Sequence, residues 1–446
     1  MHDKFEGMFA MFRKMRVEVR AIHRETSGYV LELAGLGEEG FYRVNETVFD
    51  ALALKKSIDI DPEEVWVLET KRDFSAIKLT LDTWALKEFG HKDRAVDLWR
   101  NEEDFQGREA RSHLYFERAK FVQSIGLYDG GVLEDFEKGY LTSAPDNLRS
   151  ADVMSWGDYI WYTRGTEMIC RDIFDIAQRV PASPAQRIKI ISYLADAGDY
   201  ARAADQFREL VKLRPNIHLT NRYMGLSHFL YEEGLCDDPR TRADHDLLNK
   251  LRANDGSFEK MVRENSVAIV GSSPKQLGTG TGAQIDAHDF VVRFNQARPD
   301  FKFSEDYGSK FNVWVKSTAN MFVKRQPFNP HIDLAIMVDG GFYKTKNLHL
   351  RFADMASEYK LQVIPSTVFF EVISKIQRQP SLGLLMIYWM SLLRGDMKDQ
   401  HNIFGISLND QGANKTVHYY ELGKKISGHR HDWDAERRLF EEIVTT

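Results

Sequence analysis

The sequence predicts an α/β fold for its carboxyl-terminal part, residues 252–446, with a mostly parallel sheet flanked by helices. Two observations support this. Short apolar segments bounded by turn residues recur as candidate strands at 266–271, 290–294, 313–315, 334–338 and 402–405. An apolar stretch at 382–393 is long enough for a buried helix. Because strands alternate with helices, we expect parallel strands, with ligands bound beyond their carboxyl ends.

Composition limits the class of protein. The chain has 446 residues, 43% of them hydrophobic and 28% charged, with a formal net charge of −6. This excludes a disordered chain and argues against a nucleic-acid partner. Two cysteines, Cys170 and Cys236, cannot form a disulfide framework, which indicates a reducing compartment. The charged start and the short apolar run at 382–393 predict no transmembrane segment. We expect a cytoplasmic protein, with peripheral attachment at the inner membrane as the alternative.

Residues 1–83 predict a small β-rich module. Apolar and polar residues alternate at 16–20, 29–33, 65–68 and 77–81, and glycines separate these segments. The module carries no motif with a chemical interpretation.

Residues 84–251 have the periodicity of helices and contain a repeated pattern. Gly198, Ala203, Phe207 and Pro215 define it. A second copy, 33 residues earlier, has Gly165, Cys170, Phe174 and Pro181, and a third, out of phase, has Gly90, Ala95 and Trp99. The spacing resembles the tetratricopeptide repeat, which offers a concave surface to a protein partner. An ordinary helical bundle, or packing on the next domain, is the alternative.

A glycine-rich loop, residues 271–282, follows the first strand of the carboxyl-terminal domain. Glycines allow close approach of a ligand, and exposed amides suit phosphate oxygens. However, the glycine cluster begins seven residues after Gly271, and the chain has no Gly-Lys-Ser/Thr sequence. A nicotinamide oxidoreductase or a P-loop protein is therefore disfavoured.

The residues after this loop carry a more specific pattern. Residues 285–297 and 306–310 read IDAHDFVVRFNQA and DYGSK. This run resembles the large motif of the animal-type sialyltransferase family. Residues 380–385, with Phe404-Gly405, resemble its small motif, residues 418–421 its third motif, and residues 431–436 its His-x4-Glu motif. The resemblance covers about residues 262–442. It implies a GT-A-like or Rossmann-type fold and an inverting, metal-independent glycosyltransferase that uses a CMP-activated sugar acid and a glycan acceptor.

The resemblance also implies roles for individual residues. His431 would be the general base, with Glu436 orienting or stabilising its imidazole, and His418 would stabilise the leaving phosphate. A histidine with a near-neutral pKa suits the removal of a proton from a hydroxyl group. The residues expected to bind the donor nucleotide and sugar are Gly271, Ser272, Ser273, Asn295, Ser381, Leu382, Gly383 and Gly405. No metal ligand is expected among them.

The chain departs from the family pattern at several points. Ser272 replaces an asparagine, Leu382 replaces a threonine, and the family's bridging cysteines are absent. These departures, together with the absence of a membrane anchor, predict a microbial relative acting in capsule or lipopolysaccharide synthesis. They leave CMP-sialic acid and CMP-Kdo both open as donors. The alternative is a non-catalytic repeat scaffold with a degenerate nucleotide-binding domain.

Overall fold

The architecture comes from a computed structural model, and side chains are described from residue 115 onward. The described residues are 15–25, 28–35, 38–44, 66–70, 108–143, 148–165, 182–295, 301–317, 329, 331–338, 346–347, 350, 353–395, 397, 402–406 and 431–445. Residue contacts divide the chain into two units, Met1–Arg118 with Glu137–Ala144, and Ala119–Phe136 with Pro145–Thr446.

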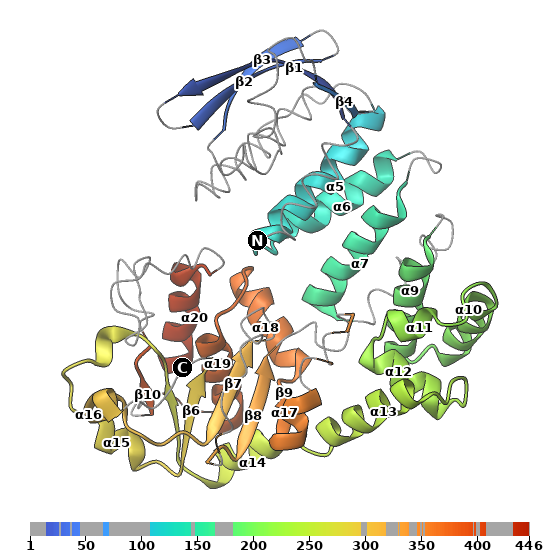
Figure 1. Cartoon of the computed structure of the whole chain (residues 1–446). Helices are drawn as coiled ribbons and strands as arrows, with labels where there is room; N and C mark the ends of the chain where they lie inside the picture. The colour runs from blue at the N-terminus through green and yellow to red at the C-terminus, as the bar shows by residue number, and fades with distance from the viewer. Residues whose placement is uncertain are drawn as a thin grey trace. The chain divides into compact units, whose positions relative to one another are not determined.

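A six-stranded parallel sheet organises the second unit (Figure 1). Its strand order is β10-β5-β6-β7-β8-β9, and every neighbouring pair is parallel. The strands are β5 (Val267–Val270), β6 (Phe290–Phe294), β7 (Val313–Ser317), β8 (Leu334–Val338), β9 (Leu361–Val363) and β10 (Ile403–Phe404). The predicted α/β class with a mostly parallel sheet is confirmed. Strand β9 was not predicted.

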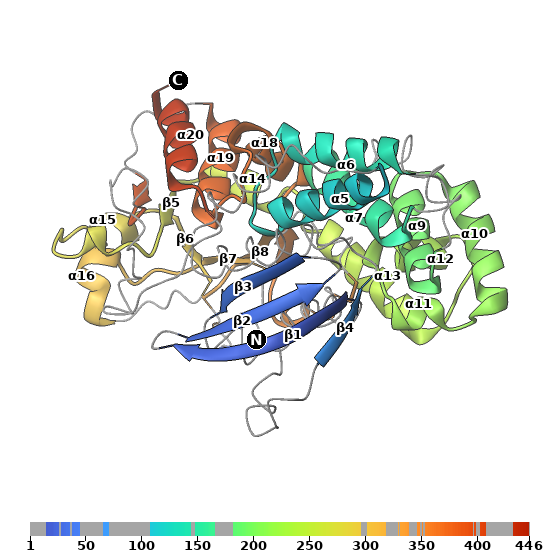
Figure 2. The same ribbon diagram turned by 90° about the horizontal axis from the view of Figure 1, so that it is seen from above.

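Helices cover both faces of this sheet. On one face lie α14 (Ser257–Glu264), α18 (Ser366–Ile376), α19 (Leu382–Arg394) and α20 (Trp433–Thr445), which share a core with alternate residues of β5 to β8. Figure 2 shows these four helices gathered on one side of the strands. On the other face, α13 (Pro239–Arg252) and α17 (Ala353–Glu358) pack on β7 to β9, and α15 (Gly282–Asp286) and α16 (Ser304–Tyr307) pack near β5 and β6. Burial on both faces explains why the strands are mostly apolar.

The strand order places a topological switch beside β5. From β5 the chain adds β6 to β9 on one side, and it returns much later to place β10 on the other side. The loops after β5 and β10 therefore leave the sheet side by side at its carboxyl edge, which is where ligands bind in open parallel sheets. The predicted site residues Gly271 and Gly405 follow these two strands.

Helices fill the described part of the chain between the two sheets. They are α5 (Arg108–Ser124), α6 (Gly130–Thr142), α7 (Ser150–Arg164), α9 (Pro184–Asp196), α10 (Tyr200–Leu213), α11 (Ile217–Thr220) and α12 (Met224–Glu232). Ala203 and Phe207 are buried on α10, which packs on α9. Most of the second repeat copy and all of the third lie outside the described residues, so the tetratricopeptide assignment and its protein partner stay predictions.

The first unit contains an antiparallel sheet of order β3-β2-β1-β4. Its strands are β1 (Met15–Glu25), β2 (Gly28–Gly35), β3 (Glu38–Val44) and β4 (Trp66–Thr70). The predicted strands at 16–20, 29–33 and 65–68 correspond to β1, β2 and β4, whereas 77–81 lies outside the described residues. The domain boundaries at 83 and 251 stay predictions. Among the described residues, no helix is both long and apolar enough to cross a membrane.

The close approach of the loops after β5 and β10 leads to a first prediction. A Cβ atom at Gly271 would lie 2.3 Å from the Gly405 carbonyl oxygen and 2.6 Å from Ile406 Cγ1. Gly271→Ala should therefore lower the free energy of unfolding by about 1–3 kcal/mol, as overpacking does. Thermal and denaturant unfolding measure this.

Gly383→Ala is the matched control. Its Cβ would meet Ile406 Cδ1 at an ordinary 3.5 Å, and the residue lies in the first turn of α19. Alanine has the higher helix propensity, so this variant should be unchanged or more stable by up to about 1 kcal/mol. Equal stability losses in the two variants would contradict the close approach at Gly271.

Candidate active site

The loops after β5 and β10 are fastened to each other. Gly271 N–H donates to the Phe404 carbonyl oxygen at 2.8 Å, and Ser273 N–H donates to that of Gly405 at 2.9 Å. Gly405 has a left-handed φ of 60°, and its N–H donates to Gln276 Oε1 at 3.0 Å. The structure therefore brings together three of the predicted residues, Gly271, Ser273 and Gly405.

The amino terminus of α19 lies against the same loops. The Ile406 side chain lies between the start of α19 and the loop after β5. A Cβ atom added to Gly383 would lie 3.5 Å from it, and one added to Gly271 would lie 2.6 Å from it. Segments more than a hundred residues apart in sequence therefore meet at the carboxyl edge of the sheet (Figure 1).

Ser381 caps α19. Its backbone is extended (φ −73°, ψ 155°), and its hydroxyl accepts a hydrogen bond from Leu384 N–H at 3.2 Å. The first amides of a helix, here those of Leu382 and Gly383, have no acceptor within the helix and carry partial positive charge. This end of α19 is therefore suited to an anionic group of a ligand. The half-buried Leu382 side chain packs against the core between α19 and the sheet.

Glu436 joins α20 to this cap. Its side chain is fully buried, and Oε1 accepts a hydrogen bond from Ser381 N–H at 2.7 Å. Oε2 shares a 2.6 Å hydrogen bond with the Ser381 hydroxyl. Burial raises the pKa of Glu436 to about 8, although both hydrogen bonds from Ser381 oppose the shift. The carboxyl group is therefore mostly protonated at neutral pH.

His431 stands beside Glu436 with a defined tautomer. Its Nδ1 lies 2.9 Å from the Gln379 carbonyl oxygen and 3.6 Å from Glu436 Oε1. A carbonyl oxygen can only accept, so Nδ1 carries the proton and Nε2 is the basic nitrogen. The side chain is 28% exposed, so a ligand can reach it. His431 precedes α20, and its contact with Glu436 is made across the start of that helix.

Residues upstream of the sheet support this histidine, and the sequence did not reveal them. Gln379 Oε1 accepts hydrogen bonds from Tyr162 OH at 2.6 Å and from Tyr128 OH at 3.5 Å. Gln379 N–H donates to the Gly126 carbonyl oxygen at 2.9 Å. The carbonyl group that orients His431 is therefore held by the segment after α5 and by α7.

Asn295 follows β6 at the carboxyl edge of the sheet. It is left-handed, with φ 49°, which is uncommon for a residue other than glycine. Its N–H donates to the Val315 carbonyl oxygen at 2.8 Å, and its Oδ1 accepts from Ser317 N–H at 3.2 Å. Its carbonyl oxygen accepts from Trp314 Nε1 at 2.9 Å. Such strain, held by several hydrogen bonds, is typical of functional positions.

Some amides of the glycine-rich loop, which the sequence suggests as donors to phosphate oxygens, already have a partner in the structure. Gly280 N–H donates to Asp306 Oδ1 at 2.9 Å. Hydrogen bonds from the amides of Gly278, Gly280 and Thr279 lower the pKa of Asp306. These amides already hold a carboxylate, so a phosphate group would compete with it.

Other residues of the large motif also have structural partners. Asp286 Oδ1 accepts from the N–H groups of Ser309 (2.9 Å) and Lys310 (2.8 Å). Buried Arg293 donates to the carbonyl oxygens of Lys310 at 2.9 Å and Tyr307 at 2.6 Å. Much of the motif therefore shapes the loop at residues 307–310.

Two predicted residues remain to be placed. Half-buried Ser272 follows Gly271, and it makes no hydrogen bond to another residue in the described part of the chain. It lies at the carboxyl end of β5. His418 lies outside the described residues, so its place relative to His431 is not described.

One buried basic residue of the sheet was not predicted. Lys316, in β7, is 5% exposed, and burial lowers its pKa to about 8. Its Nζ lies 3.6 Å from the centroid of the Trp314 ring. A lysine within an otherwise apolar strand, VWVKS, is the sequence signal that could have identified it.

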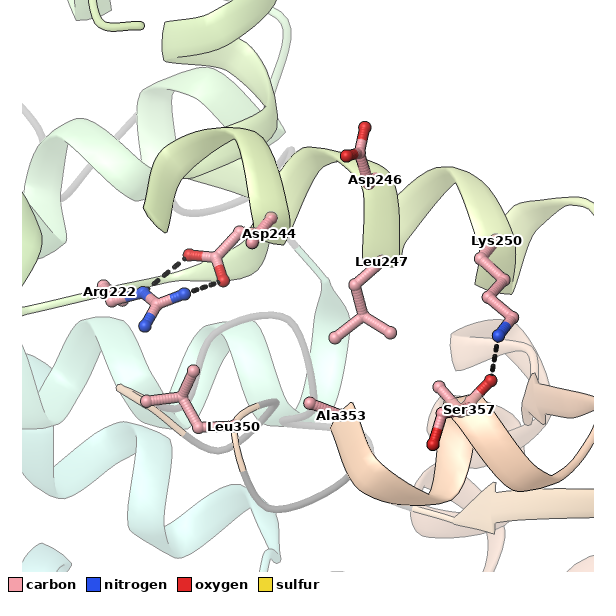
Figure 3. A pocket seen from close by; sticks show the side chains of 10 residues that line it. Arg222, Asp244, Asp246, Leu247, Lys250, Leu350, Ala353 and Ser357 are labelled. Atoms are coloured by element: carbon pink, nitrogen blue, oxygen red, sulfur yellow. Dashed lines mark hydrogen bonds and ion pairs between the residues drawn. The ribbon is translucent and has the colours of Figure 1, made fainter. Parts of the chain in front are cut away.

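A pocket between α13 and α17 is separate from these residues. It has a volume of about 270 Å³ and contains none of the predicted site residues (Figure 3). Arg222 pairs with Asp244 at its wall, and Lys250 donates to the Ala356 carbonyl oxygen. Since these charged groups bind one another or the backbone, the pocket forms part of the packing between the two helices.

Comparisons with known proteins find a similarity in the carboxyl-terminal part of the chain. Residues 240–341 match the family model of glycosyltransferase family 29 (sialyltransferase), which confirms the resemblance predicted from the motifs. The mouse and rat proteins named CMP-N-acetylneuraminate-beta-galactosamide-alpha-2,3-sialyltransferase 2 are each 26% identical over 200 residues, covering 40% of this chain. The matched part spans 53% of each relative, so the chain covers about half their length.

A solved structure is also similar. It is a mammalian sialyltransferase in complex with Gal-beta-1-3GalNAc-ortho-nitrophenol, 21% identical in sequence. The match covers 45% of this chain and 76% of that chain, with a TM-score of 0.33.

The buried Glu436 predicts a pH-dependent stability. Its pKa of about 8 in the folded protein is above the usual value near 4.5, so folding favours the protonated form. Stability from this group is fully present below about pH 4.5 and is lost as the pH rises through 8. Since one pKa unit corresponds to about 1.4 kcal/mol, wild type should lose a few kcal/mol relative to Glu436→Gln over this interval. Unfolding titrations of both proteins at pH 5 to 9 measure this.

Glu436→Gln keeps the size and hydrogen bonding of the protonated carboxyl group, so titration of all other groups cancels in the comparison. Glu436→Ala is the contrasting variant, since it leaves Ser381 N–H without its acceptor and should be less stable at every pH. A constant difference between wild type and Glu436→Gln from pH 5 to 9 would show that the carboxyl group does not titrate as described.

Proposed function

We propose that this chain transfers sialic acid from CMP-sialic acid to a hydroxyl group of a glycan, with inversion at the anomeric carbon. The observation that carries the proposal is the position of His431. Its Nδ1 is fixed by the Gln379 carbonyl group, and Glu436 connects it to the amino terminus of α19. A basic nitrogen thus lies close to an anion-binding helix end, in a domain similar to sialyltransferases.

His431 would act as the general base. Its Nε2 takes the proton of the acceptor hydroxyl group while that oxygen attacks the anomeric carbon from the face opposite the nucleotide. The bond from the anomeric carbon to the phosphate oxygen breaks, and CMP leaves with the electron pair. Glu436, neutral at pH 7, is a positioning residue that holds Ser381 and fixes the distance between α19 and α20.

The amino terminus of α19 would bind the anionic part of the donor. The amides of Leu382 and Gly383, with the Ser272 hydroxyl group, offer donors to a carboxylate or phosphate at the carboxyl edge of the sheet. By the resemblance, His418 stabilises the charge that develops on the leaving CMP, and Asn295 holds the nucleotide. These groups supply the stabilisation that a metal ion would otherwise give, so we propose transfer without a divalent cation.

The named relatives favour one donor and one acceptor class. The names of the mouse and rat proteins specify CMP-N-acetylneuraminate and a beta-galactosamide. We therefore propose sialic acid as the sugar and a galactose-terminated glycan as the acceptor. The comparisons give no support to CMP-Kdo or to a capsule or lipopolysaccharide acceptor, which the departures in sequence had suggested.

Incubation with CMP-sialic acid and, separately, with CMP-Kdo tests the proposal. CMP release should rise on addition of a galactose-terminated acceptor with CMP-sialic acid only, and adding Mg²⁺ or Mn²⁺ should change the rate by less than about twofold. If the protein binds CMP but turns over neither donor, the proposed enzymatic activity is contradicted and the non-catalytic scaffold is favoured. Release from CMP-Kdo alone would overturn the choice of donor.

His431→Ala should lower kcat by about 10²–10⁴-fold, the range typical of a positioned general base. The KM for the donor should change little, because His431 acts on the acceptor hydroxyl group. Steady-state kinetics with varied donor separate the two effects. His331→Ala, at an exposed histidine before β8, is the matched control and should keep wild-type rates. Wild-type kcat in His431→Ala would reject the assignment.

A further inference from the structure

A cluster of three potential metal ligands lies in the helical region, away from the candidate active site. His218 belongs to α11, Cys236 to the loop after α12, and Asp238 to the position just before α13. One ligand atom from each residue lies within 4.8 Å of the other two. Imidazole, thiolate and carboxylate are the three side-chain ligand types of protein zinc sites.

The separations between these atoms match a tetrahedral ion. Cys236 Sγ is 3.1 Å from His218 Nε2 and 3.0 Å from Asp238 Oδ2, and the last two atoms are 3.7 Å apart. Zinc bonds of about 2.0–2.3 Å at tetrahedral angles place neighbouring ligand atoms about 3.3–3.6 Å apart. The three atoms therefore already lie close to one face of such a tetrahedron.

Each ligand is held in place by a contact outside the cluster. The backbone N–H of Cys236 donates to the Leu230 carbonyl oxygen at 3.1 Å. Asp238 Oδ1 accepts hydrogen bonds from the first amides of α13, and Oδ2 faces the cluster while accepting a hydrogen bond from the Thr241 hydroxyl group. The His218 ring packs edge-on against Phe207, with centroids 5.5 Å apart. Such support orients ligands before a metal ion binds.

From this geometry we propose that His218, Cys236 and Asp238 bind one Zn²⁺ ion, with a fourth position open to water. The Asp238 side chain is 24% exposed, which gives solvent access to that position. On binding, the Cys236 thiol loses its proton to solvent and the sulfur forms a bond to zinc. The ion would fasten the loop between α12 and α13 to α11, a role independent of the proposed transfer reaction.

A second histidine cluster in the same region does not suit a cation. His228 Nδ1 lies 3.0 Å from His245 Nδ1, with Glu232 3.4 Å from the latter. However, Arg252 donates to His228 Nε2 at 3.1 Å and brings a positive charge to the ring. A histidine in this cluster is therefore a matched control.

Zinc binding by the full-length protein tests the proposal. After chelator treatment and desalting, the protein is equilibrated with Zn²⁺, passed through a desalting column and analysed for bound metal. We expect about one zinc per chain in wild type, in Cys170→Ser and in His228→Gln. Cys236→Ser and His218→Gln should each bind zinc at least about tenfold more weakly. Circular dichroism confirms that each variant is folded.

Co²⁺ gives an independent readout, because its absorption reports the metal–thiolate bond directly in the folded wild-type protein. The wild-type protein with Co²⁺ should show thiolate-to-cobalt charge-transfer absorption, which Zn²⁺ displaces. Cys170→Ser should keep this absorption and Cys236→Ser should lose it. The proposal is overturned if wild type retains no zinc, if Cys236→Ser binds zinc as tightly as wild type, or if His228→Gln abolishes binding.

Discussion

The candidate active site depends on one buried contact, between Glu436 of α20 and Ser381 at the start of α19. The carboxyl group accepts the Ser381 amide hydrogen and shares a hydrogen bond with its hydroxyl, and no solvent reaches it. This contact sets the cap of α19, and the same carboxyl group lies 3.6 Å from the His431 imidazole. Loss of these hydrogen bonds would leave a buried carboxyl group unsatisfied and lower the free energy of unfolding by about 1–3 kcal/mol. Because the same carboxyl group contacts both, the start of α19 and the His431 imidazole are positioned together.

Most of the parallel sheet could be predicted because its strands are buried on both faces. Residues 290–294 and 334–338 were predicted with the bounds that β6 and β8 have. β9 was missed because it has three residues with a glutamine in the middle. Gln362 is 1% exposed, accepts from Phe258 N–H at 2.8 Å and donates to Glu259 Oε2 at 2.8 Å. A buried polar residue whose hydrogen bonds come from distant parts of the chain interrupts the apolar run by which a buried strand is recognised in the sequence. β3 was missed because Gly40 interrupts its alternation.

The candidate site was predictable where a motif lies on one continuous segment, and less so where distant segments meet. The His431 and Glu436 pair and the Ser381 cap follow from short motifs. The use of glycine-loop amides by Asp306 could not be predicted, since it depends on the loop at residues 304–308 folding back on residues 278–280. For the same reason, the role of the buried Arg293, whose guanidinium group donates hydrogen bonds to backbone carbonyl groups, could not be predicted from the sequence.

The orientation of His431 depends in part on residues that lie before the region of the family resemblance. The Gln379 carbonyl group fixes the proton on Nδ1, and Tyr162 of α7 holds the Gln379 side chain. An antiparallel bridge between Leu127 and Arg378 ties the same segment to the chain after α5. If Gln379 rotated, the Nδ1 proton would lose its carbonyl acceptor, and the nearest remaining acceptor would be Glu436 Oε1 at 3.6 Å. The Nδ1-protonated tautomer would then be less strongly favoured. The loop after α5 and helix α7 thus contribute to the chemistry of the site by holding Gln379, whose carbonyl group orients the imidazole.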